Sequence, residues 1–104
     1  MRKFRLTIEY DGSDFYGFQK QPDRRTVQGE LEKSLSELLS EPVKVVGAGR
    51  TDAGVHATGQ VVNFKTGRPF PSENAAEVIN QHLPSDLTVR KRQEVDNGFH
   101  ARRL

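Results

Sequence analysis

Residues 3–10 alternate between polar and apolar side chains over the length of a whole strand. The apolar positions are Phe4, Leu6, Ile8 and Tyr10, and the positions between them are Arg5, Thr7 and Glu9. Because successive side chains of a strand point to opposite faces, this pattern predicts a strand with one buried face and one polar face. Hydrophobic residues make up only 34% of the chain, which favours either a half-covered sheet or a chain that packs further protein against one face.

The apolar spacing changes to that of a helix after Thr26, which is a suitable N-cap. The apolar positions of this segment are Val27, Leu31, Leu35, Leu38 and Leu39. Pro42 cannot continue the helix. Residues 11–25 are expected to form a loop, which starts with the turn-forming pair Asp11-Gly12.

Later segments predict three more strands and a second helix. The strands cover residues 43–46, residues 60–64 and a segment from Leu87 to Val95. Ser72 can cap the second helix, which ends before Pro84. Its apolar positions are Ala75, Ala76, Ile79 and Leu83. The order β-α-β-β-α-β predicts an α+β, ferredoxin-like fold: a four-stranded antiparallel sheet with two helices on one face.

Two expectations concern the end of the chain. Alternation places Arg90 and Arg92 on the same face of the last strand, away from the helices. Residues 96–104 have no clear partner within the chain.

Composition limits the classes of function. The 104 residues suffice for a single domain, 1–104, and contain no cysteine, which excludes disulfides and thiolate metal sites. The histidines His56, His82 and His100 are scattered, so we expect no metal site. The first ten residues alternate instead of forming the apolar block of a signal peptide, and no apolar run could span a bilayer, so we expect a cytoplasmic location and no membrane partner. The net charge is +2, and its clustered basic residues suit either a polyanion partner or a solvated surface.

The glycine-rich segment 47–59 carries the candidate chemistry. Arg50 and Asp52 are two residues apart, so in an extended backbone both side chains address the same spot. An aspartate with an ordinary pKa of ~3.9 is ionised near neutral pH, as a nucleophile must be, and a nearby guanidinium favours that form. The same residues also suit a plain hairpin loop with a surface ion pair.

Several sequence blocks, taken in order, resemble TruA-type tRNA pseudouridine synthases over nearly the whole chain. The central block is Gly49-Arg50-Thr51-Asp52-Ala53-Gly54-Val55-His56-Ala57. Upstream are Glu9-Tyr10-Asp11-Gly12, Tyr16-Gly17-Phe18-Gln19-Lys20-Gln21 and Thr26-Val27-Gln28, and downstream is Phe99-His100-Ala101-Arg102. Phe18 departs from the pattern, because the family usually has tryptophan there.

The resemblance implies an enzyme that isomerises uridine to pseudouridine in the tRNA anticodon stem-loop, without a cofactor. It assigns the essential carboxylate to Asp52, which either adds to the ribose C1′ or acts as a base in a glycal route. It assigns to Arg50 the extrusion of the target base. The family is also expected to form a homodimer.

Family members continue past the Phe-His-Ala-Arg block into a second subdomain, which holds the tyrosine that packs against the target base. We therefore expect residues 1–104 to be the N-terminal, catalytic-aspartate subdomain and residues 96–104 to begin the connection to the second one. On this reading the chain alone is inactive.

Six further residues are candidates for RNA binding: Arg24, Arg25, Phe18, His56, His100 and Arg102. Each has an alternative. Arg24 and Arg25 suit either phosphate contact or a solvated surface. Phe18, like Phe15 and Tyr16, can stack on a base or cover the core. His56 is either an acid or base, or a hydrogen-bonding part of its turn. His100 and Arg102 either line the cleft or only connect subdomains.

Two other functions share this topology. A non-catalytic RNA-binding module, the main alternative, should carry an aromatic-rich third strand, which residues 59–64 lack. An acylphosphatase-like hydrolase needs a phosphate-binding loop after its first strand, but residues 11–14 are acidic there.

Overall fold

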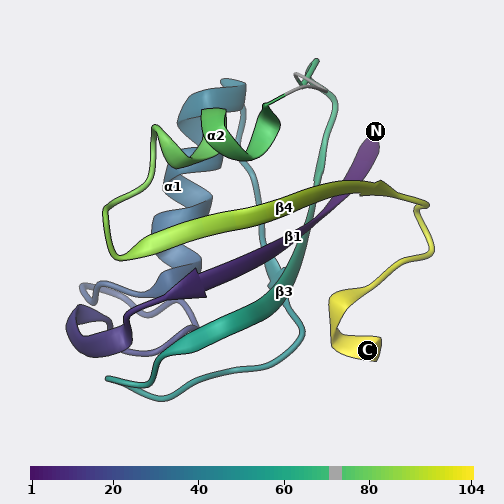
Figure 1. Ribbon diagram of the computed structural model, residues 1–104. Coiled ribbons are helices and arrows are strands. Elements are labelled where there is room, and N and C mark those ends of the chain that lie inside the picture. Colours follow the sequence, from purple (N-terminus) through teal and green to yellow (C-terminus); the bar gives the residue numbers. More distant parts are fainter. Residues whose placement is uncertain (71–73) are drawn as a thin grey trace.

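The structure is a computed structural model that describes residues 1–70 and 74–104. Strand β1 (Arg2–Tyr10) is followed by a 3-10 turn, η1 (Gly12–Asp14), and by helix α1 (Val27–Leu39). Strands β2 (Val46–Gly47) and β3 (Ala57–Thr66) come next, then helix α2 (Ala75–Asn80), strand β4 (Leu87–Val95) and a second 3-10 turn, η2 (Ala101–Arg103). The predicted β-α-β-β-α-β order is confirmed (Figure 1).

The strands form one antiparallel sheet in the order β2-β3-β1-β4, and both helices lie on one side of it (Figure 1). In the central pair, Leu6 is opposite Val62 and Phe4 is opposite Phe64. These side chains pack against the apolar faces of the helices, including Leu31, Leu35 and Ile79. The ferredoxin-like α+β fold is therefore confirmed.

The first helix begins as predicted. The Thr26 side chain accepts a hydrogen bond from the Gly29 N–H, and Ser40 ends the helix in the left-handed conformation (φ 54°). Helix α2 is shorter than expected and begins after Asn74. The predicted cap, Ser72, lies outside the described residues. Asn80 attaches the end of α2 to β4, because its amide side chain donates to the Val89 carbonyl and accepts from the Val89 N–H.

The second strand was predicted over residues 43–46, but β2 consists of Val46 and Gly47, which pair with β3, and the Ala48 N–H also donates to Val61 of β3. Val43 and Val45 are buried, as a strand pattern requires. Their N–H groups instead donate to side chains of α1: Val43 to Ser36 and Val45 to Glu32. Hydrophobic periodicity cannot distinguish these side-chain partners from a strand partner. Strand β3 extends beyond the predicted residues 60–64 at both ends.

Arg90 and Arg92 do not share a face. The register between β1 and β4 shifts at Thr7/Ile8, which marks a bulge in β4. Beyond it, the Arg92 guanidinium lies over the rings of Phe4 and Phe70, 4.8 and 5.2 Å from their centroids. Arg90 donates to the Thr58 carbonyl of β3. One extra residue reverses the alternation, so the prediction for Arg92 was wrong.

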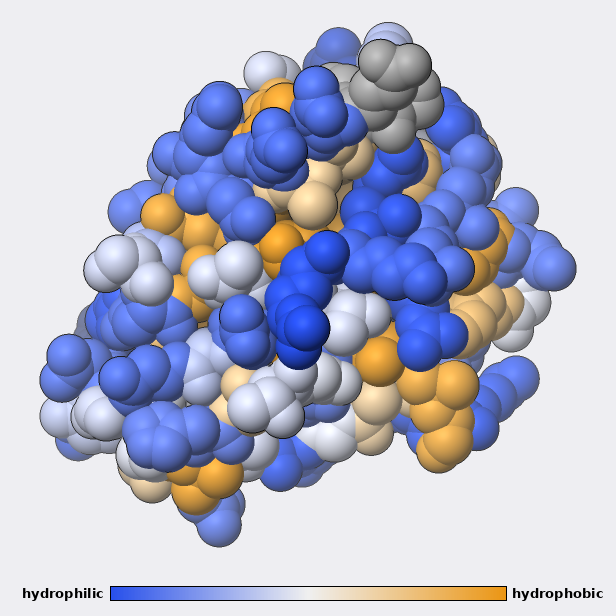
Figure 2. All heavy atoms as spheres, in the orientation of Figure 1, coloured by the Kyte–Doolittle hydropathy of each residue, from blue (hydrophilic) through white to orange (hydrophobic). Residues whose placement is uncertain are grey.

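The C-terminal segment does have partners within the chain, contrary to expectation. Lys3 donates through Nζ to the carbonyls of Asn97 and Phe99, and buried Asn63 accepts a hydrogen bond from the Ala101 N–H at 2.7 Å. Ala101 is fully buried. The segment thus packs beside the sheet (Figure 1). Hydrophilic residues cover most of the face seen in Figure 2, and apolar residues appear in several small separate groups.

Candidate active site

Two hydrogen bonds hold Thr51, the residue before Asp52. The Thr51 carbonyl accepts a hydrogen bond from the Phe18 N–H at 3.0 Å. The Thr51 hydroxyl lies 2.7 Å from the hydroxyl of Tyr10, at the end of β1. Tyr10 is buried, and burial raises the pKa of its hydroxyl, so it stays protonated near neutral pH. Thr51 is therefore attached to both the first strand and the first loop.

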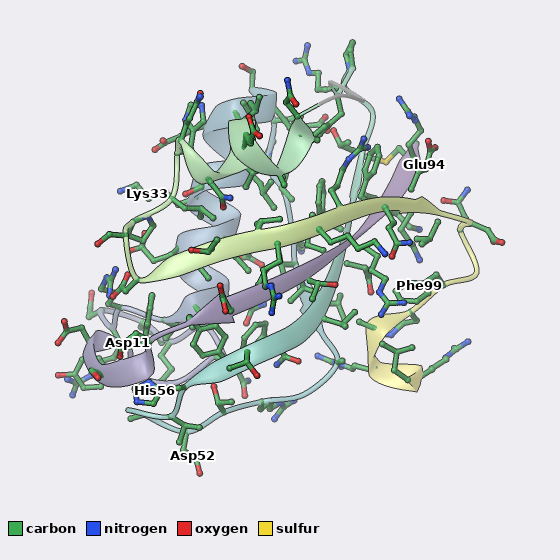
Figure 3. All side chains as sticks on the ribbon, viewed as in Figure 1. Asp11, Lys33, Asp52, His56, Glu94 and Phe99 are labelled. Atoms are coloured by element: carbon green, nitrogen blue, oxygen red, sulfur yellow. The ribbon has the colours of Figure 1, made fainter. Side chains whose placement is uncertain are left out.

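The residues after Asp52 form a turn that is anchored on the same loop. The Val55 N–H donates to the Asp52 carbonyl at 3.1 Å, and the Gly54 N–H donates to the Phe15 carbonyl at 3.2 Å. The Asp52 side chain itself is exposed, and Figure 3 shows it pointing away from the sheet at the tip of the loop. A fixed backbone thus carries an accessible carboxylate.

Two glycines of the first loop allow this close packing. A Cβ atom at Gly12 would lie 1.9 Å from the Val55 carbonyl oxygen. One at Gly17, which has a φ of +82°, would lie 2.7 Å from the Thr51 carbonyl oxygen. Any larger residue at either position would push the segment around Asp52 outwards.

Asp52 is one of the residues that line a cavity of about 370 Å³. This volume lies within the range of ~300–1,000 Å³ that is common for small-molecule sites. The lining residues are Tyr16, Gln19, Gln21, Arg50, Thr51, Asp52 and Ala53. Arg50 and Asp52 thus line the same cavity, but so do Thr51 and Ala53, so this lining is not specific to residues two positions apart. In the described part of the chain, no ion pair joins them, so both charged groups remain available to a ligand.

Arg50 also borders a second, smaller cavity of about 100 Å³, and Arg102 of the C-terminal segment borders it too. Its other lining residues are Phe18, Gln19, Gln28, Val45, Gly47 and Gly49. Of the predicted RNA-binding residues, Arg102 is thus brought next to the candidate site. Because Arg50 and Arg102 are far apart in the sequence, their spacing could not predict that they line the same cavity.

His56 lies away from the Asp52 cavity. Its Nδ1 accepts a hydrogen bond from the Gly12 N–H at 2.8 Å and lies 3.2 Å from Asp11 Oδ1 (Figure 3). It borders a different cavity, of about 410 Å³, with Asp11 and Asp86 among its lining residues. This geometry supports the alternative in which His56 is a hydrogen-bonding part of the turn.

The neighbouring residues Arg24 and Arg25 differ in their contacts within the chain. Arg25 forms a two-pronged pair with Asp86, at 2.8 and 2.9 Å, and lies 4.1 Å above the Phe15 ring. Its guanidinium lowers the pKa of Asp86 through these hydrogen bonds. Arg24 is exposed and lies 4.6 Å above the ring of Tyr16, which lines the Asp52 cavity. Arg24 is therefore the better placed of the two for a ligand.

The aromatic residues of the first loop also differ in exposure to solvent. Phe18 and Phe15 are each only 3% exposed, whereas Tyr16 is 48% exposed. Burial of the Phe18 ring favours its role in the core over stacking on a base. Gln19 and Gln21 also line the Asp52 cavity, a placement that the sequence analysis missed. Their position in the same sequence block as Phe18 was the signal that could have found them.

His100 is half-buried, and its Nδ1 accepts a hydrogen bond from the Arg102 N–H at 3.3 Å. It therefore caps η2 and does not border the cavities that Arg50 lines. Within residues 1–70 and 74–104, no group of three or more histidine, aspartate or glutamate side chains is placed to hold a metal ion. No helix in those ranges is long and apolar enough to cross a membrane.

Comparison with known proteins agrees with the resemblance in the sequence. Residues 6–102 match the family model described as tRNA pseudouridine synthase. The chain is 55% identical over 104 residues to tRNA pseudouridine synthase A of Dictyoglomus turgidum, and 49% identical over 102 residues to that of Brevibacillus brevis. Each match covers 98% of this chain but only 42% of the relative. The chain thus spans about two fifths of the length of these relatives.

Proposed function

Because the chain belongs to the tRNA pseudouridine synthase family, we propose that it supplies the catalytic carboxylate for converting uridine to pseudouridine in tRNA. One observation carries this proposal: Asp52 is exposed, stands on an anchored turn and is among the residues that line a cavity of about 370 Å³. A nucleoside must reach the essential carboxylate directly, and this carboxylate is accessible.

In the proposed reaction, the bond between the ribose C1′ and uracil N1 breaks, the freed base turns, and a new bond joins C1′ to C5. The hydrogen on C5 is lost as a proton, and N1 ends protonated. Asp52 either adds to C1′ or removes a sugar proton on the glycal route. In both cases the carboxylate must be ionised and close to the sugar.

The target uridine must first leave its stack, at a cost of a few kcal/mol. Arg50 borders the same cavity as Asp52, and we assign to it the extrusion of the base. A planar guanidinium can stack in place of the base, which a lysine ammonium cannot do. Tyr16 is exposed beside the cavity and offers a ring on which a base can stack.

The proposed substrate is a uridine of the tRNA anticodon stem-loop, and the proposed assembly is a homodimer of the longer protein. The chain spans 42% of its Dictyoglomus turgidum relative, so we also propose that residues 1–104 alone do not turn over tRNA. Candidate RNA contacts within the chain are Arg24 and Arg102.

The decisive experiment uses a chimaera in which this chain replaces the matching segment of the Dictyoglomus turgidum relative. Asp52→Asn should abolish pseudouridine formation, measured by mass spectrometry, while tRNA binding persists. Asp23→Asn is the matched control, because Asp23 is also exposed and asparagine tolerates its φ of 58°. Turnover by the Asp52→Asn chimaera would remove the catalytic assignment. RNA binding without turnover in the parent chimaera would favour the non-catalytic RNA-binding module.

A further inference from the structure

We propose that Arg102 and Arg50 together bind one RNA backbone phosphate next to the target uridine. This inference rests on the proposed function and adds a phosphate subsite to it. The two arginines come from distant segments, the C-terminal turn η2 and the loop before β3, yet both line the same small cavity of about 100 Å³.

The position of Arg102 is determined by its neighbours in the chain. Ala101 is fully buried, and its N–H donates to Asn63 of β3 at 2.7 Å. The Arg102 N–H donates to His100 Nδ1. Two carbonyls just upstream, those of Asn97 and Phe99, accept hydrogen bonds from Lys3 (the Phe99 side chain is shown in Figure 3). The backbone just before Arg102 is therefore fixed against the sheet, while Arg102 itself is exposed.

The charge around this cavity favours an anion. Its lining residues include two arginines and no carboxylate. Within the ranges that the structure describes, neither guanidinium forms an ion pair. Glu32 accepts hydrogen bonds from two of the lining residues, the Gln28 side chain and the Val45 N–H, and lies 3.4 Å from Lys20. Two guanidinium groups that line one cavity repel each other, and a phosphate bound between them would relieve that repulsion.

Arg50 connects this subsite to the candidate active site, because it also lines the Asp52 cavity. A nucleotide whose sugar faces Asp52 can therefore place an adjacent phosphate between Arg50 and Arg102. The edge of a guanidinium donates hydrogen bonds to phosphate, while its face remains available for stacking. Arg50 can thus serve both roles on one nucleotide.

The first test measures binding of the 104-residue chain to a short uridine-containing RNA hairpin by fluorescence anisotropy at several salt concentrations. Arg102→Gln should weaken binding about tenfold, since it removes a charge-assisted contact. It should also reduce the slope of log K against log salt concentration by about one, which is the contribution of one phosphate contact. Arg103→Gln is the matched control, because Arg103 is the next residue, is exposed and does not line the cavity. Equal effects of the two substitutions would overturn the proposal.

The second test uses hairpins in which one phosphate beside the uridine carries a neutral methylphosphonate. At one phosphate position, the methylphosphonate should weaken binding of the hairpin to the unmodified chain. At that same position it should not further weaken binding to the Arg102→Gln variant, as a double-mutant cycle requires for a direct contact. Additive losses at every position, or no RNA binding at all, would rule out the subsite. The proposed function is decided separately, by turnover of the chimaera with and without Asp52, so the two ideas can fail independently.

Discussion

The hydroxyl groups of Tyr10 and Thr51 lie 2.7 Å apart and join the end of the first strand to the residue before Asp52. Tyr10 is only 5% exposed, so this hydrogen bond is largely shielded from water. The Thr51 carbonyl is held as well, by the Phe18 N–H. The position of the Asp52 backbone is therefore set by the sheet.

The first prediction concerns this hydrogen bond. Tyr10→Phe removes the phenolic hydroxyl and should cost about 1 kcal/mol of stability. In the chimaera it should lower kcat for pseudouridine formation several-fold with little change in KM, because Asp52 is displaced but the RNA contacts remain. Thr51→Ser keeps the hydroxyl and should retain most activity, whereas Thr51→Val should resemble Tyr10→Phe. An unchanged kcat in Tyr10→Phe would show that the contact does not position Asp52.

The second prediction concerns the close contact at Gly12. Gly12→Ala places a methyl group 1.9 Å from the Val55 carbonyl oxygen, so the loop must move. We expect a loss of about 1–3 kcal/mol of stability and a clear loss of activity in the chimaera. Gly59→Ala is the control, because a Cβ there meets nothing within 4 Å. Thermal unfolding and turnover of both variants check this, and similar behaviour of the two would argue against it.

The third prediction separates Arg24 from Arg25. Arg25→Gln breaks the pair with Asp86 and the contact with Phe15, so it should lower the free energy of unfolding by about 1 kcal/mol. Arg24→Gln should leave stability unchanged and weaken RNA binding, since its guanidinium is exposed over Tyr16. Denaturant titrations and anisotropy on the same two variants provide the comparison. The reverse pattern would exchange the roles assigned to them.

The fourth prediction is a pH dependence of stability. Arg25 lowers the pKa of Asp86 in the folded state, so the pair stabilises the protein above the unfolded-state pKa of ~3.9. This stabilisation is lost as the pH falls through the lowered pKa. Asp86→Asn should therefore cost about 1 kcal/mol at pH 7 and progressively less below pH ~4. Glu37→Gln on the exposed face of α1 should show no such difference, and a constant cost of Asp86→Asn down to pH 2 would contradict the assignment.

The sequence alone could single out the candidate catalytic loop, but it could not predict the surroundings of Asp52. The glycine-flanked block around Arg50 and Asp52 identified the loop. The partners of Thr51 come from β1 and from the first loop, and no local pattern specifies those pairings. Tyr16 and Phe18 are two residues apart in one loop, yet one ring is exposed and the other buried. The backbone reversal at Gly17, with its φ of +82°, is consistent with that difference.

By itself, the sequence determined the order and type of the elements and the apolar faces of β1 and α1. These follow from periods of 2 and 3.6 residues, which are properties of the local backbone. Only the tertiary structure decided that Arg25 pairs with Asp86, that a bulge turns Arg92 towards Phe4, and that Arg102 lies beside Arg50. Such contacts depend on the register of the strands and on how distant segments pack. The spacing of residues along one segment does not encode either of these.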